Sequence, residues 1–129
     1  YLYYGDHAKE ALDWLARVFG FGPSTRYVDD AGVVHEGHIM VGDTPVMVCG
    51  ASPAEAHGQG MLLIVHLDDV DAHYRRTVAA GVDASPPEDK PYGPRAYSVT
   101  DPWGYTWAFW EHVSDYVEGG VNTLHEIEV

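Results

Sequence analysis

The hydrophobic positions in the first part of the chain change their spacing several times, and each change predicts an element of secondary structure. Between residues 7 and 19 the apolar side chains recur at steps of three and four, which predicts a helix with one buried face. Asp6 precedes this segment as a suitable N-cap, and Gly20 follows it as a helix stop. The remaining apolar runs are short and bounded by turn residues, which is typical of strands. These predicted strands cover residues 1–4, 24–28, 33–41 and 44–49.

The second part of the chain repeats this order of elements. An apolar strand is expected over residues 61–67, and Asp69 then caps a helix over residues 70–80 that ends at Gly81. Three further strands are predicted, over residues 82–85, 95–100 and 105–111. The last two are joined by Asp101-Pro-Trp-Gly104, where Pro fixes φ early in the turn and Gly accepts a positive φ.

The two halves therefore form an internal repeat of strand, helix and three strands, which predicts an α+β fold of two βαβββ modules. With 129 residues the chain is long enough for one domain with a substantial core. The predicted organisation is a single domain with module 1 at residues 1–49, a linker rich in small residues at 50–60, module 2 at 61–112 and a tail at 113–129.

Charge and cysteine content narrow the choice of partners. The formal net charge is −13 and the sequence pI is about 4.7, which disfavours nucleic acids and anionic membranes because both attract basic surfaces. Cys49 is the only cysteine, so the chain forms no internal disulfide and no cysteine-based zinc site. No apolar stretch approaches the roughly 20 residues of a membrane span. We expect a cytoplasmic protein that binds a small molecule and has no nucleic-acid or membrane partner.

Aromatic residues concentrate in the last predicted hairpin. Its final strand alternates aromatic and small side chains, so Ala108 and Trp110 share one face while Trp107 and Phe109 share the other. We expect this hairpin to reach both the core of the fold and the cavity that the fold forms.

Four segments follow one another in a specific order: residues 11–21, 65–73, 79–82 and 100–104, the last together with the strand that follows it. In this order they resemble the vicinal-oxygen-chelate superfamily, which includes glyoxalase I, bleomycin-resistance proteins, fosfomycin-resistance enzymes and extradiol dioxygenases. Residues 41–48 are also similar to the PhnB-like branch of that superfamily. The resemblance implies paired βαβββ modules with cupped mixed sheets, one helix in each module, and completion of the cup in a homodimer.

The resemblance also implies positions at which family enzymes hold a divalent metal with His or Glu. The first position falls just before Tyr1. The second falls on Leu62 and the third on Ala108, and neither side chain can bind a metal. We therefore expect no cofactor, and a protein similar to the bleomycin-resistance branch that binds a small molecule without a metal and sequesters an antibiotic or an aromatic metabolite.

The ligand contacts are expected on the strand faces that carry Leu62 and Ala108. Such faces combine rings, aliphatic groups and imidazoles, which suits a planar or amphipathic molecule. Tyr92 is added because the loop before the last hairpin lies where a lid over the cavity is expected. The candidate ligand-binding residues are Tyr3, Glu36, His38, His66, Tyr92 and Trp110.

Two other functions stay open at this stage, and the catalytic residues are unknown. The first is a glyoxalase-like, metal-dependent isomerase or lyase, with a displaced metal site formed by Glu36, His38 and His66 or with His66 as a general base. The second is a catalytically silent member of the family that acts through protein contacts. The other histidines that the sequence places at helix ends, in the linker or in the tail are expected to be solvated: His7, His57, His73 and His125.

Overall fold

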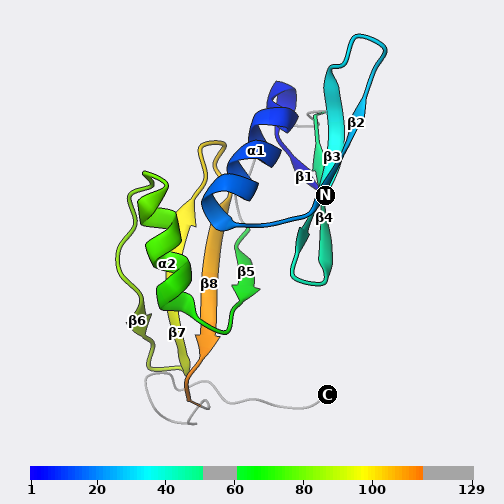
Figure 1. The fold of residues 1–129 in the computed structure, drawn as a ribbon. Helices are drawn as coiled ribbons and strands as arrows, with labels where there is room; N and C mark the ends of the chain where they lie inside the picture. The colour runs from blue at the N-terminus through cyan, green and yellow to red at the C-terminus, as the bar shows by residue number, and fades with distance from the viewer. Residues whose placement is uncertain (51–60, 115–129) are drawn as a thin grey trace, which may run out of the picture.

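The computed structural model describes residues 1–50 and 61–114 and shows two modules with the same order of elements (Figure 1). Module 1 consists of β1 (Leu2–Tyr3), a 3-10 turn η1 (Gly5–His7), α1 (Ala8–Phe19), β2 (Ser24–Val28), β3 (Val34–Val41) and β4 (Thr44–Cys49). Module 2 consists of β5 (Leu63–His66), α2 (Val70–Ala79), β6 (Glu88–Asp89), β7 (Pro94–Thr100) and β8 (Thr106–His112). The predicted linker and most of the predicted tail lie outside the described residues.

The strand pairing is the same in both modules. The first sheet has the order β1-β4-β3-β2 and the second has the order β5-β8-β7-β6. In each sheet the first strand pairs parallel with the last strand, and the other pairs are antiparallel. The α+β fold of two βαβββ modules that the sequence predicts is therefore confirmed.

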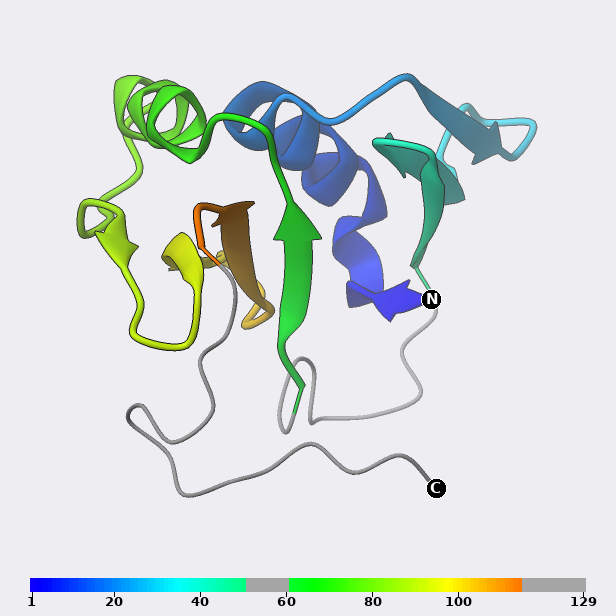
Figure 2. The ribbon, with the colours of Figure 1, turned by 90° about the horizontal axis from the view of Figure 1, so that it is seen from below.

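Both helices lie on the same side of the two sheets, which leaves the opposite sheet faces without a helix (Figure 2). The apolar stripe of α1 is fully buried, as the three- and four-residue spacing predicts. This helix also packs against module 2, because the Phe19 ring lies 5.8 Å from the Trp107 ring and 4.9 Å from the Phe109 ring. One core therefore joins the two modules. None of the helices in the described part of the chain is long and apolar enough to cross a membrane.

Two local predictions are wrong. Asp6 does not cap α1: Gly5 adopts a positive φ of 59° that starts a 3-10 turn, and this turn places Asp6 inside it. No strand forms over residues 82–85, because Pro86 and Pro87 have no amide hydrogen to donate and pairing with β7 begins only at Glu88. Asp69, in contrast, caps α2 as predicted, and its side chain accepts a hydrogen bond of 3.0 Å from the Ala72 amide.

Candidate functional site

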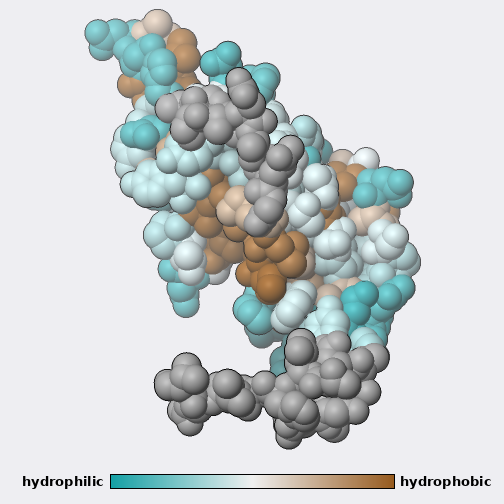
Figure 3. Space-filling view, turned by 180° about the vertical axis from the view of Figure 1, so that it is seen from behind, coloured by the Kyte–Doolittle hydropathy of each residue, from teal (hydrophilic) through white to brown (hydrophobic). Residues whose placement is uncertain are grey.

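The sheet faces that carry no helix present the candidate site, and we call them the open faces. On the second sheet, strand alternation and register place Ile64, Ala108 and Ser98 in one row of the open face, with His66, Trp110 and Ala96 in the next. Hydrophobic side chains gather on this side of the molecule (Figure 3). Leu62 is 53% exposed and Ile64 is 42% exposed, so the apolar surface here is open to solvent.

A hollow of about 250 Å³ lies beside Trp110 on the open face of the second sheet. Ala96 and Ala108 are both buried, and their small side chains leave space between the larger residues around them. The Tyr92 ring lies 5.8 Å from the Trp110 ring, so the loop before β7 adds a wall. The lining residues are Leu62, Lys90, Tyr92, Ala96, Tyr97, Ser98, Ala108 and Trp110.

The open face of the first sheet carries the carboxylate of Glu36. The strand register places Tyr3, Cys49, Glu36 and Tyr27 in a single row across all four strands. His38 lies in the adjacent row, 6.4 Å from the Tyr27 ring. In the described part of the chain the carboxylate of Glu36 forms no hydrogen bond or ion pair.

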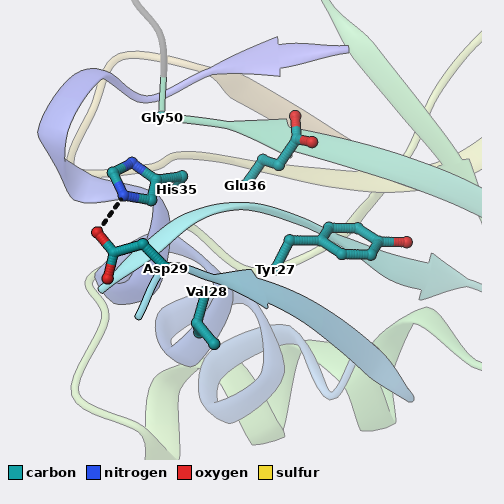
Figure 4. Close-up of a pocket in the computed structure, with 6 residues that line it drawn as sticks. All are labelled: Tyr27, Val28, Asp29, His35, Glu36 and Gly50. Atoms are coloured by element: carbon teal, nitrogen blue, oxygen red, sulfur yellow. Dashed lines mark hydrogen bonds and ion pairs between the residues drawn. The ribbon is translucent and has the colours of Figure 1, made fainter. Parts of the chain in front are cut away.

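A second hollow, of about 450 Å³, lies at the Glu36 and Tyr27 end of this row. Figure 4 shows both side chains among the residues that line it. Asp29 lies in the same hollow and accepts hydrogen bonds from the Ala31 and Val33 amides at 2.9 and 3.0 Å. Its second oxygen lies 2.8 Å from His35 Nε2. The hydrogen bond from His35, followed by that from the Val33 amide, lowers the pKa of Asp29, so this carboxylate is already satisfied by the hairpin.

A third hollow, of about 740 Å³, lies between the modules beside β5. His73 is among its lining residues, and the expectation that this histidine is solvated is wrong. Its Nε2 donates to the Phe19 carbonyl oxygen at 2.9 Å, and its Nδ1 accepts from the Tyr97 hydroxyl. Burial lowers the pKa of His73, and the nearby Arg76 charge acts in the same direction. A signal was present in the sequence, because Val70, His73 and Thr77 have the spacing of one helix face.

Among the described residues, the candidate metal ligands do not come together. Glu36 and His38 lie on β3 of the first sheet, whereas His66 lies on β5 of the second. Over residues 1–50 and 61–114 no group of three or more His, Cys, Asp or Glu side chains is close enough to hold a metal ion. The displaced metal site predicted as an alternative is therefore not assembled within one chain.

The six candidate ligand-binding residues fall into two groups of three. Tyr3, Glu36 and His38 belong to the open face of the first sheet. His66 and Trp110 belong to the open face of the second sheet, where their rings lie 6.1 Å apart, and Tyr92 contacts Trp110 from the loop. Their roles in binding stay predictions. The predicted solvated histidines His57 and His125 lie outside the described residues.

Comparisons with known proteins agree with this fold. Residues 1–109 match the model of the Glyoxalase/Bleomycin resistance protein/Dioxygenase superfamily. The crystal structure of TioX from Micromonospora sp. ML1 has 37% sequence identity and a TM-score of 0.71, over 87% of this chain and 94% of that one. No curated protein matches the chain significantly.

Two more distant structures have the same fold. TnmS3 from Streptomyces sp. CB03234, described as an antibiotic binding protein, has 23% identity and a TM-score of 0.68, over 86% of this chain and 92% of that one. Lactoylglutathione lyase from Agrobacterium tumefaciens has 21% identity and a TM-score of 0.61, over 85% of this chain and 88% of that one.

Proposed function

The chain belongs to the glyoxalase/bleomycin resistance protein/dioxygenase superfamily, and from this premise we propose that it binds a small molecule with a planar aromatic group, without a metal. The observation that carries this proposal is the hollow beside Trp110. Ala108 leaves space at a position where the family resemblance implies a metal-binding carboxylate, and Trp110 and Tyr92 line that space with rings. Stacking on such rings binds a planar group without any metal.

The chemistry of both open faces supports a neutral or cationic ligand. The only carboxylate of the six candidate residues is Glu36, which lies between Tyr27 and Cys49 in its row and forms no ion pair among the residues described. The net charge of −13 adds a long-range attraction for cations. Sequestration of an antibiotic or an aromatic metabolite is the biological role that we propose. The superfamily fold that it shares with TnmS3 is consistent with this role.

The proposal includes a homodimer. A single chain leaves Leu62 and Ile64 exposed on one open face and Tyr27 exposed on the other. A second copy that covers these faces removes that apolar area from water, which favours association by about 25 cal/mol for each Å² buried. Size-exclusion chromatography with light scattering tests the dimer separately from ligand binding. A cytoplasmic location also stays a prediction.

The alternative is a metal-dependent isomerase or lyase. The similarity to lactoylglutathione lyase favours it, but at 21% identity this similarity concerns the fold alone. Leu62 and Ala108 supply no metal ligand, and Glu36, His38 and His66 are divided between the two sheets, so we derive no catalytic step through a metal.

The experiment that tests the proposal is a binding screen on protein stripped of metals with EDTA. The screen uses the planar cation proflavine, the planar anion naphthalene-2-sulfonate and a panel of aromatic antibiotics, with melting temperature and tryptophan fluorescence as readouts. A saturable ligand raises the melting temperature by mass action. Trp110→Ala should abolish this rise in melting temperature. The control variant Trp14→Phe should keep it, because Trp14 lies on α1 and packs against Phe19, on the helix side of the sheets. A screen in which no compound shows saturable binding contradicts the proposal.

A further inference from the structure

The edge strand β1 has backbone groups that its own sheet does not use. It pairs parallel with β4, and the Tyr4 amide donates to the Cys49 carbonyl oxygen at 2.9 Å. In a parallel pair, successive residues direct their N–H and C=O groups to opposite edges of the strand. The N–H and C=O groups of Tyr3 therefore point to the free edge, where an unpaired polar group is costly unless it finds another partner.

The partner comes from module 2. The Tyr105 hydroxyl accepts a hydrogen bond of 2.8 Å from the Tyr3 amide and donates one of 3.0 Å to the Tyr3 carbonyl oxygen. A phenol hydroxyl has one hydrogen and acceptor lone pairs, so a single oxygen satisfies both groups. Tyr105 is only 3% exposed, and burial raises the pKa of its hydroxyl, which keeps the donated hydrogen in place.

Tyr105 is itself held by Asp101. One carboxylate oxygen of Asp101 accepts from the amides of Trp103 and Tyr105, each at 3.0 Å. The other oxygen accepts from the Tyr4 hydroxyl at 2.9 Å and from Trp107 Nε1 at 3.1 Å. Asp101 is 3% exposed, so these four hydrogen bonds replace the water that its charge has lost. The Asp101 carboxylate therefore holds both Tyr105, which bonds to the backbone of Tyr3, and Tyr4, the next residue in the chain.

We infer that Tyr105, held by Asp101, is a positioning residue for the ligand site: module 2 fixes the place of Tyr3 on the open face of module 1. This inference rests on the proposed function, because it takes Tyr3, which lies on the first sheet and outside the hollow beside Trp110, as a second contact of the same ligand. It adds a coupling between the modules, since the two hydrogen bonds on the free edge of β1 at Tyr3 come from the hairpin of module 2.

The test uses Tyr105→Phe, which removes one oxygen atom and keeps the ring in the core. The matched control is Tyr74→Phe, which removes a hydroxyl that donates a 3.4 Å hydrogen bond to the Ala84 carbonyl within module 2. Two quantities are measured: the hydrogen-exchange rate of the Tyr3 amide by NMR, and the dissociation constant of the tightest aromatic compound from the binding screen. The Tyr4 amide, bonded to Cys49, is the internal reference for exchange.

In Tyr105→Phe we expect the Tyr3 amide to exchange about tenfold faster and the compound to bind about tenfold more weakly, since one hydrogen-bonded group is lost. Tyr74→Phe should change neither quantity, even if both variants lower the melting temperature. An unchanged Tyr3 exchange rate in Tyr105→Phe overturns the inference. Faster exchange with unchanged affinity, while Trp110→Ala still loses binding, also overturns it and leaves the proposed function intact. Absence of binding to the wild-type protein contradicts the proposed function and with it the positioning role.

Discussion

His73 Nε2 lies 2.9 Å from the carbonyl oxygen of Phe19, so an imidazole of module 2 closes the end of the helix of module 1. The second ring nitrogen accepts from the Tyr97 hydroxyl, whose oxygen lies 2.9 Å from Thr77 Oγ1. This arrangement needs a neutral imidazole, because a protonated ring has no acceptor nitrogen left for Tyr97.

Acid should therefore weaken the contact between the modules. Burial lowers the pKa of His73 in the folded protein, so the contribution of this residue to stability is complete above the unfolded value of about 6.5 and is lost as pH falls through the folded value. We expect the free energy of unfolding, measured with urea, to fall between pH 7 and pH 5. In His73→Gln the fall should be smaller, and stability at pH 7 should be lower.

The control for this prediction is His7→Gln, since His7 is an exposed histidine at the start of α1. Its pH dependence should stay close to that of the wild type. Equal pH dependence in His73→Gln and the wild-type protein would show that His73 does not titrate on unfolding in the way described.

Asp101 should be one of the most sensitive polar positions in the fold. Asp101→Asn keeps the size of the side chain but replaces an acceptor oxygen with an NH2 group, which then faces the donors of Tyr4 and Trp107. We expect a loss of about 2–4 kcal/mol in the free energy of unfolding, because buried hydrogen bonds to a charge are lost. Asp30→Asn, at an exposed hairpin position, should cost less than about 0.5 kcal/mol. A loss of similar size in both variants contradicts the role given to Asp101.

Filling the hollow beside Trp110 should remove ligand binding without unfolding the protein. Ala108→Leu places a larger apolar side chain in the hollow of about 250 Å³. The affinity for an aromatic ligand should fall at least about tenfold, while the cost in stability stays within the roughly 1–3 kcal/mol typical of overpacking. Thr106→Leu is the matched control, because Thr106 lies on the same face of β8 but does not line the hollow. Undiminished binding by Ala108→Leu would place the ligand elsewhere.

The sequence predicted those parts of the fold that depend on local pattern. β2 and β4 have the predicted ends, because alternation and turn residues bound them on both sides. The Asp69 cap is also confirmed, since an N-cap needs only the helix that follows it. The prediction that Asp6 caps α1 is wrong for a reason that is also local, because the positive φ of Gly5 creates a competing turn.

Alternation also correctly predicted that Ala108 and Trp110 lie on the same face of the sheet. The parts of the fold that the sequence did not predict depend on contacts between distant residues. No local pattern shows that His73 meets the carbonyl of Phe19, 54 positions away, or that Tyr105 meets Tyr3, 102 positions away. Such pairs arise only when the two modules pack together, and they are among the contacts that join the modules.

The most direct test of metal-free binding is a calorimetric titration of one aromatic ligand from the screen into two samples of the wild-type protein. One sample is stripped with EDTA and checked by elemental analysis, and the other is supplied with equimolar zinc, nickel and manganese. The account predicts the same dissociation constant in both samples, with the heat of binding lost in Trp110→Ala. Binding that occurs only in the sample supplied with metal would contradict it.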